Sequence, residues 1–196
     1  MSGRSADRPG EPQRAQRPGA RDWAVQSLGG ETLFNGRLIE VRIERFRHPD
    51  GEEVSREIVR HRGAVGIVAQ DGERVWLVRQ PRETVEADLL EIPAGRLDVD
   101  GESPLEAAQR ELAEEVGLGA ERWEPIFTFY TSAGFSDERV HLFHATGLHE
   151  ASAESEENER IEIVAWPLAT LDEAIAECRD GKTLIGLLWL ARRLNA

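Results

Sequence analysis

The first pattern along the chain is an alternation of apolar and charged residues, and this period of two predicts β-strands. The alternation is clearest over residues 38–46, and after a Pro49-Asp50-Gly51 turn it resumes over residues 54–59. Residues 64–69 are apolar almost throughout, which is typical of a strand buried on both faces. Further strands are predicted at residues 32–34, 75–80, 89–92, 123–130, 139–145 and 161–167.

Helical patterns occur at three places, and the first of them has clear boundary signals. Ser103, Pro104 and Glu106 together form a helix N-cap, a proline at the first helical position and a capping box. Gly117 is suited to end this helix in the left-handed conformation. On a helical wheel one face, predicted to pack on the sheet, carries Leu105, Ala108, Leu112 and Val116. Two further helices are predicted at residues 171–178 and 184–194.

This order of elements predicts the fold class and the division of the chain. Strands lie before, between and after the helices, which favours an α+β fold or a mixed α/β sandwich rather than a doubly wound sheet. Residues 1–22 contain three prolines and almost no bulky apolar residue, so they are predicted to form a disordered tail. A basic interaction arm and an inert extension both fit that tail. Residues 23–60 are predicted to form an antiparallel β arm, and residues 61–196 the main domain.

Charge and cysteine content narrow the partners and the compartment. The net charge of −13 argues against a nucleic acid or an anionic membrane surface as the main partner. No apolar stretch approaches the roughly 20 residues of a membrane span, and the N-terminus lacks the apolar core of a secretory signal. Cys178 is the single cysteine, which favours a reducing, cytoplasmic location. Because the chain is so acidic, a polyanionic substrate would need local basic groups or bound metal.

Three glutamates crowd the predicted helix at residues 104–116. Glu111, Glu114 and Glu115 lie within little more than one turn, and such crowding is repulsive unless cations or solvent screen it. Hard divalent ions prefer carboxylate oxygens together with water and substrate phosphate. Such an ion would neutralise a pyrophosphate and activate an attacking water. The alternative for a bare glutamate pair is an ordinary solvated acidic helix face.

The segment from Gly95 to Leu118 resembles the signature of the Nudix hydrolases, Gly-x5-Glu-x7-Arg-Glu-U-x-Glu-Glu-x-Gly-U, where U is a bulky aliphatic residue. The match is complete from Glu102 onward, and the first spacing carries one extra residue, which predicts a longer loop before the helix. The resemblance implies the Nudix fold, a mixed α/β/α sandwich with the sheet between helices. It also implies metal-dependent cleavage of nucleoside diphosphates linked to a second group.

The resemblance also assigns roles to residues of this segment. It implies metal ligands at Glu111 and Glu115, a third at Glu114, and a contribution from the backbone carbonyl of Ala94. Arg110 and Glu102 resemble the structural pair of the family, in which the arginine orients a catalytic glutamate, here Glu115.

Residues outside the signature bear on the substrate. Residues 91–95 and 78–82 are similar to segments of ADP-ribose pyrophosphatases, which implies substrate contacts by Arg79, Arg82 and Glu91. The alternative is that the two arginines pair with nearby acids at Glu83, Glu86 or Glu91.

The segment at residues 131–138 is similar to a loop of the same enzymes, and Ser132 and Gly134 are predicted to contact the substrate. Ala133 stands where those enzymes have proline. This departure keeps another nucleoside diphosphate sugar, or a dinucleotide, open as the substrate.

A second acidic segment, residues 149–162, is similar around Glu157 to the loop that supplies the catalytic base in ADP-ribose pyrophosphatases. The match makes Glu157 the base and Glu159 a metal contact, with Glu154 and Glu156 as competitors for the base. A base outside the crowded glutamates is reasonable, because bound cations depress the basicity of their ligands.

The resemblance as a whole implies hydrolysis of ADP-ribose to AMP and ribose 5-phosphate with Mg²⁺, Mn²⁺ or another divalent ion. A non-catalytic nucleotide-sensing module is a further alternative, although such modules typically lose the carboxylates retained here. The resemblance also implies a homodimer with residues 38–59 exchanged or packed across the interface. The apolar faces of that arm suit packing within one chain equally well.

Overall fold

The computed structural model describes residues 24–152 and 160–196. The predicted tail at residues 1–22 and the loop glutamates Glu154, Glu156, Glu157 and Glu159 lie outside the described residues.

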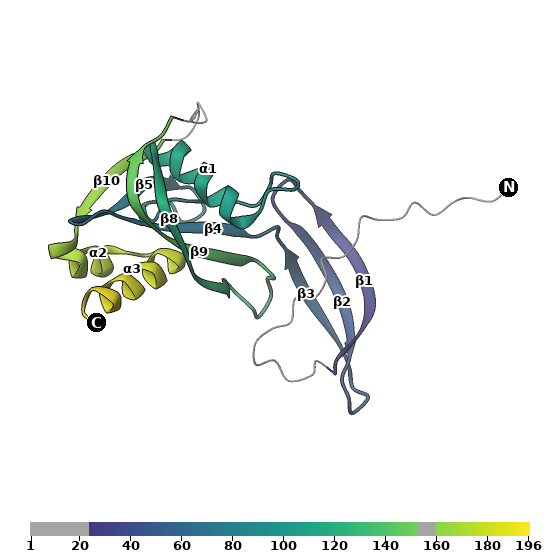
Figure 1. Ribbon diagram of the computed structural model, residues 1–196. Coiled ribbons are helices and arrows are strands. Elements are labelled where there is room, and N and C mark those ends of the chain that lie inside the picture. The colour runs from purple at the N-terminus through teal and green to yellow at the C-terminus, as the bar shows by residue number, and fades with distance from the viewer. Residues whose placement is uncertain (1–23, 153–159) are drawn as a thin grey trace.

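An antiparallel three-stranded sheet forms the N-terminal arm and projects from one end of the molecule (Figure 1). Its strands, in the spatial order β1-β2-β3, are β1 (Gln26–Asn35), β2 (Glu40–Arg47) and β3 (Glu53–Arg60). Strand β1 is longer than the predicted segment at residues 32–34, because it pairs along the whole of β2 through two register shifts. The arm meets the body where Val59 N donates to Phe135 O at 2.8 Å and Asp137 N donates to Val59 O at 3.2 Å.

The body is built on a mixed seven-stranded sheet with the order β10-β5-β4-β9-β8, where β6 pairs with β5 and β7 with β4. Strands β4 and β9 run parallel, and the other pairs are antiparallel. The strands are β4 (Ala64–Gln70), β5 (Arg74–Arg82), β6 (Ala87–Glu91), β7 (Ala94–Arg96), β8 (Leu118–Tyr130), β9 (Arg139–Glu150) and β10 (Glu162–Pro167). The apolar run at residues 64–69 is β4, whose residues from Val65 to Ala69 are buried as predicted.

Helices cover both faces of this sheet, which confirms the predicted mixed α/β/α sandwich (Figure 1). Helix α1 (Pro104–Val116) packs on one face, over a core that includes Ile67 and Leu112. Helices α2 (Leu171–Glu177) and α3 (Gly181–Leu194) pack on the other face, after a short 3-10 turn, η1 (Leu168–Thr170). Within the described residues, no helix is long and apolar enough to cross a membrane.

The ends of α1 are those that the sequence predicts. Ser103 accepts a hydrogen bond from Glu106 N, the Glu106 side chain accepts one from Ser103 N, and Gly117 ends the helix at φ 72°. The predicted apolar face is wrong at Leu105, which is 39% exposed. Leu105 lies in the first turn beside the exposed loop at residues 98–101, and Ala107 is buried in its place.

Candidate active site

A cleft of about 660 Å³ opens beside β7 and the C-terminal half of α1. Side chains from α1 line one side of it, and the end of β5 and the first turn of α3 line another. The end of β8 and the following residue, Thr131, complete the cleft.

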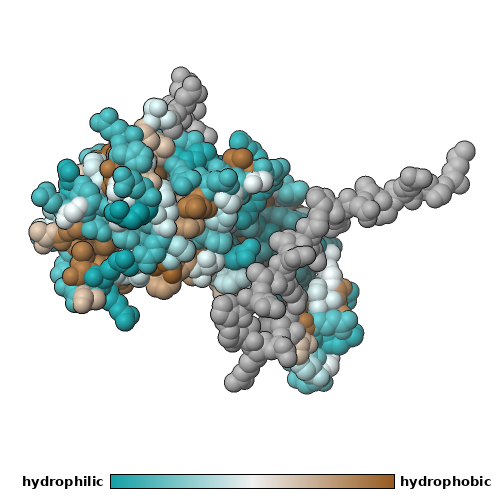
Figure 2. Space-filling model, in the orientation of Figure 1, coloured by the Kyte–Doolittle hydropathy of each residue, from teal (hydrophilic) through white to brown (hydrophobic). Residues whose placement is uncertain are grey.

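Hydrophilic residues dominate the surface of the molecule in the view of Figure 2, which agrees with a charged fraction of 31%.

The acidic wall of the cleft consists of Glu111, Glu114 and Glu115 on α1. Arg110 connects it to the loop before the helix. Its Nε and Nη2 donate to the two oxygens of Glu102 at 2.9 and 3.1 Å, while Nη1 donates to Glu111 at 2.7 Å and Glu114 at 2.8 Å. The hydrogen bonds to Glu102 are the largest cause that raises the pKa of Arg110, and they outweigh the opposing effect of burial. The predicted pairing of Arg110 with Glu102 is therefore present.

Strand β7 lies directly against this wall. Ala94 N donates to Glu115 Oε2 at 2.9 Å, and the Glu115 side chain is buried. Gly95 is required by close approach, since a Cβ atom there would lie 2.0 Å from Glu111 Oε1. The absence of a side chain at Gly95 lets the Glu111 carboxylate rest over the backbone of β7.

The predicted metal ligands within the described residues, Ala94, Glu111, Glu114 and Glu115, thus come together at one side of the cleft. In the described part of the chain, no three acidic, histidine or cysteine side chains are arranged to hold a metal ion as they stand. Glu111 and Glu114 are instead paired with Arg110 Nη1.

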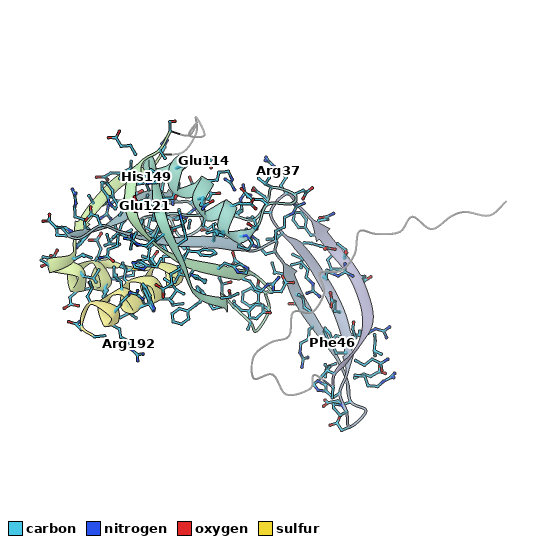
Figure 3. The ribbon with its side chains drawn as sticks, in the orientation of Figure 1. Arg37, Phe46, Glu114, Glu121, His149 and Arg192 are labelled. Carbon is cyan, nitrogen blue, oxygen red and sulfur yellow. The ribbon has the colours of Figure 1, made fainter. Side chains whose placement is uncertain are left out.

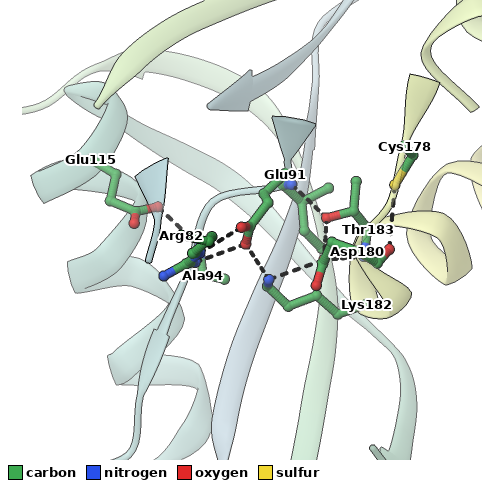
Figure 4. A network of polar contacts seen from close by, with 9 residues as sticks. Arg82, Glu91, Ala94, Glu115, Cys178, Asp180, Lys182 and Thr183 are labelled. Carbon is green, nitrogen blue, oxygen red and sulfur yellow. Dashed lines mark hydrogen bonds and ion pairs between the residues drawn. The ribbon is translucent and has the colours of Figure 1, made fainter. Parts of the chain in front are cut away.

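The paired wall of the cleft consists of Arg82, Glu91, Asp180 and Lys182 (Figure 4). Arg82 Nε and Nη2 donate to Glu91 Oε1 and Oε2 at 2.6 and 2.8 Å, and Lys182 donates to the same Oε2. Glu91 is 1% exposed and lies behind the other members, which line the cleft. Burial alone would raise the pKa of Glu91, but the hydrogen bond from Arg82 and the charge of Lys182 outweigh it and lower that pKa.

The two arginines predicted to contact substrate do not share a position. Arg79 and Arg82 are three residues apart on β5, and because side chains alternate along a strand they point to opposite faces. Arg79 Nη2 donates to Glu177 Oε1 of α2 at 2.5 Å and does not line the cleft, whereas Arg82 does. The alternative interpretation, pairing with a nearby acid, holds for Arg82 with Glu91. Arg79 pairs with an acid that is distant in the sequence.

The loop after β8 divides its residues between two sites. Ser132 and Gly134 do not line the cleft, because residues 132–136 form a turn that docks on the arm. Gly134 instead borders a second cavity of about 300 Å³, between the arm and this loop. Thr131 and Glu138 face the cleft, with Thr131 Oγ1 donating to Glu138 Oε2 at 2.7 Å.

Sequence reasoning missed Glu138, Asp180 and Lys182. Glu138 lies in the segment at residues 131–138, where only Ser132 and Gly134 are predicted to contact the substrate. The backbone N–H of Glu138 donates to the Ser136 hydroxyl. Lys182 had a signal that was available, because it is the only lysine in a chain with 24 lysine and arginine residues. Its partner Glu91 is 91 positions away, so only the fold brings the two together.

Comparison with known proteins shows the family and agrees with this fold. Residues 59–184 match the family model described as the NUDIX domain, which spans most of the chain, and the protein belongs to the Nudix family. The chain is 39% identical over 173 residues to a methanol dehydrogenase activator of Bacillus methanolicus, covering 84% of this chain and 91% of that protein. It is 42% identical over 147 residues to an ADP-ribose pyrophosphatase of Mycobacterium tuberculosis (strain ATCC 25618 / H37Rv), covering 74% and 71% of the two chains.

A crystal structure of an ADP compounds hydrolase superposes with a TM-score of 0.77 at 26% identity, covering 87% of this chain and 94% of that one. The predicted fold is thereby confirmed.

Proposed function

We propose that this protein hydrolyses the pyrophosphate bond of ADP-ribose to give AMP and ribose 5-phosphate, in a reaction that depends on a divalent ion. The observation that carries the proposal is the cleft itself, in which the three glutamates of α1 and the cations Arg82 and Lys182 line one cavity. A diphosphate fits between such groups, because metal-bound carboxylates and a fixed guanidinium both stabilise phosphate oxygens. The names of the ADP-ribose pyrophosphatase and ADP compounds hydrolase relatives support this choice of substrate.

The acidic wall fits a hard divalent ion by its donor chemistry. Glu111, Glu114, Glu115 and the Ala94 carbonyl would hold the ion, and Mg²⁺ is the expected choice because it favours carboxylate oxygens. Nudix hydrolases generally depend on divalent metals; a bound ion would supply charge neutralisation of the pyrophosphate and a more acidic water. Arg110 would keep its two bonds to Glu102 and release Glu111 and Glu114 when those carboxylates are needed as ligands.

The remaining roles fall on residues of this chain. Arg82, fixed by Glu91, would bind a phosphate oxygen and so orient the substrate. Arg110 would tie α1 to Glu102 in the preceding loop and so orient the part of the helix that carries Glu115. The general base is proposed to be Glu157, with Glu159 as an additional metal contact, both outside the described residues.

We also propose that the arm, residues 23–60, joins two copies of the chain into a homodimer. Large apolar side chains are exposed on or beside β1, namely Leu33, Phe34 and Leu38, at 52–56%. Such exposure suits burial against a partner. The variant F34S should shift the sedimentation of the protein toward the monomer. Unchanged sedimentation would count against dimerisation through the arm. The cytoplasm is the proposed compartment, given the single free cysteine, Cys178.

The experiment that tests the function is product analysis on a substrate panel. The protein is incubated with Mg²⁺ and ADP-ribose, ADP-glucose, GDP-mannose, NADH or diadenosine polyphosphates, and the released nucleotides are separated. We expect AMP and ribose 5-phosphate from ADP-ribose at the highest kcat/KM. No turnover of any member would overturn the hydrolase proposal and favour a sensing module. A preference for another nucleoside diphosphate sugar would change only the substrate, which Ala133 keeps as the second candidate.

A further inference from the structure

The single lysine of the sequence lies in the paired wall, at the second residue of α3. The Lys182 side chain is 13% exposed, and its ammonium group contacts Glu91 Oε2 and, at 3.0 Å, Asp180 Oδ2. The other residues among the 24 lysines and arginines of the chain are all arginine. A compact ammonium group with rotatable donors suits the space between two carboxylates, where a planar guanidinium needs more room.

The first turn of α3 contacts the end of β6 through two neighbouring residues, Lys182 and Thr183. Lys182 binds the Glu91 carboxylate, and Thr183 Oγ1 accepts a hydrogen bond from Ile92 N at 2.9 Å. Asp180 fixes both partners, because its Oδ2 accepts from Lys182 and from Thr183 N and Oγ1. Since Pro93 and Ala94 follow directly, α3 also locates the start of β7 beside the acidic wall.

The charges of the paired wall balance. Arg82 and Lys182 carry two positive charges, and Glu91 and Asp180 carry two negative ones, with the pKa of each carboxyl group lowered by its partners. Without Lys182 the wall would carry a net charge of −1, facing the glutamates of α1. Glu91 would then keep Arg82 as its only partner among the contacts of the described residues.

We propose that Lys182 is a positioning residue for substrate binding. It holds Glu91 in the orientation that presents Arg82 to the cleft, and it keeps the paired wall electrically neutral toward a diphosphate. The inference rests on the proposed function, in that the bound group is the pyrophosphate of ADP-ribose. Lys182 acts through Glu91 and Arg82, so it affects binding of substrate more than the chemical step.

The test compares steady-state kinetics of four variants with Mg²⁺ and ADP-ribose. K182M should raise KM about tenfold and leave kcat within about threefold, since a lost charge-assisted contact weakens binding by roughly this factor. K182R keeps the charge but puts a larger, planar group between the two carboxylates, so KM should rise less than in K182M. R193M is the matched control, because it removes one positive charge from the far end of α3 and should change neither constant.

The double variant D180N/K182M separates charge balance from structure. Asparagine preserves the N-cap of α3, and the substitution restores neutrality. Because only the charge balance is restored, and not the hold on Glu91, we expect a KM between those of K182M and the wild type, whereas a merely structural role predicts losses that accumulate.

Wild-type KM in K182M, or a loss in kcat alone, would overturn the inference. If the wild type turns over no ADP-ribose, the proposed function fails; if it does and K182M matches it, only the inference fails. Melting by circular dichroism confirms that each variant is folded.

Discussion

The two walls of the cleft are built in different ways. The acidic wall comes from consecutive turns of one helix, and the loop partner of Arg110, Glu102, is only eight positions away. The paired wall brings Arg82 and Glu91 together with Lys182 from the far end of the chain, 91 positions after Glu91. The glutamates of the first wall lie on one helix whose ends are set by residues close in the sequence, Ser103 and Gly117. The second exists only when the sheet and α3 are in place.

The largest effect is expected at the acidic wall. E111Q and E115Q should each lower kcat on the order of 100-fold or more, because each removes a charged oxygen from the proposed metal platform. Glu121 is exposed on β8 (Figure 3) and does not line the cleft, so E121Q serves as the control. Initial rates across a Mg²⁺ titration check the prediction. Normal turnover in both E111Q and E115Q would show that α1 takes no part in the chemistry.

The paired wall should respond differently, in KM. R82M should raise KM for ADP-ribose about 10- to 100-fold, the range of a hydrogen bond between charged groups. R79M removes a neighbouring arginine of the same strand that pairs with Glu177 outside the cleft, and KM should stay within about twofold. Equal effects of the two variants would contradict the division of Arg79 and Arg82 between opposite faces of β5.

The same contrast explains how far sequence reasoning could reach. Ser103, Gly117 and the glutamates of α1 follow one another along the chain, so spacing and cap chemistry predict both the helix and its role. The contact of Lys182 with Glu91 depends on α3 packing against β6, which no local pattern contains. Alternation along β5 could have separated Arg79 from Arg82, because residues three apart cannot share a face. Likewise, the turn at residues 132–136 docks on β3, and this long-range pairing draws Ser132 and Gly134 away from the cleft.

A smaller effect is expected from pH on stability. The folded protein lowers the pKa of Glu91 below its ordinary value of 4.5, so the unfolded chain binds more protons in acid. The stabilisation is complete above pH 4.5 and is lost as the pH falls through the lower folded-state pKa of Glu91. Urea unfolding between pH 6 and 3 should therefore show a steeper loss for the wild type than for E91Q. Parallel curves would show that the Glu91 pair does not couple protonation to folding.

The smallest effect concerns the N-cap residues of two helices, Ser103 of α1 and Asp180 of α3. Ser103 caps α1 through a single acceptor contact and is exposed, so S103A should cost about 1 kcal/mol of stability and leave KM unchanged. Asp180 caps α3 and also holds Lys182 and the Thr183 hydroxyl, so D180A should cost more, about 2 kcal/mol, and should raise KM as well. Urea midpoints and KM measured on both variants make the comparison. A cap that serves only its own helix affects only stability, whereas a cap that joins distant segments also affects the cleft. Equal changes in stability and KM in S103A and D180A would mean that the paired wall is determined as locally as the acidic wall.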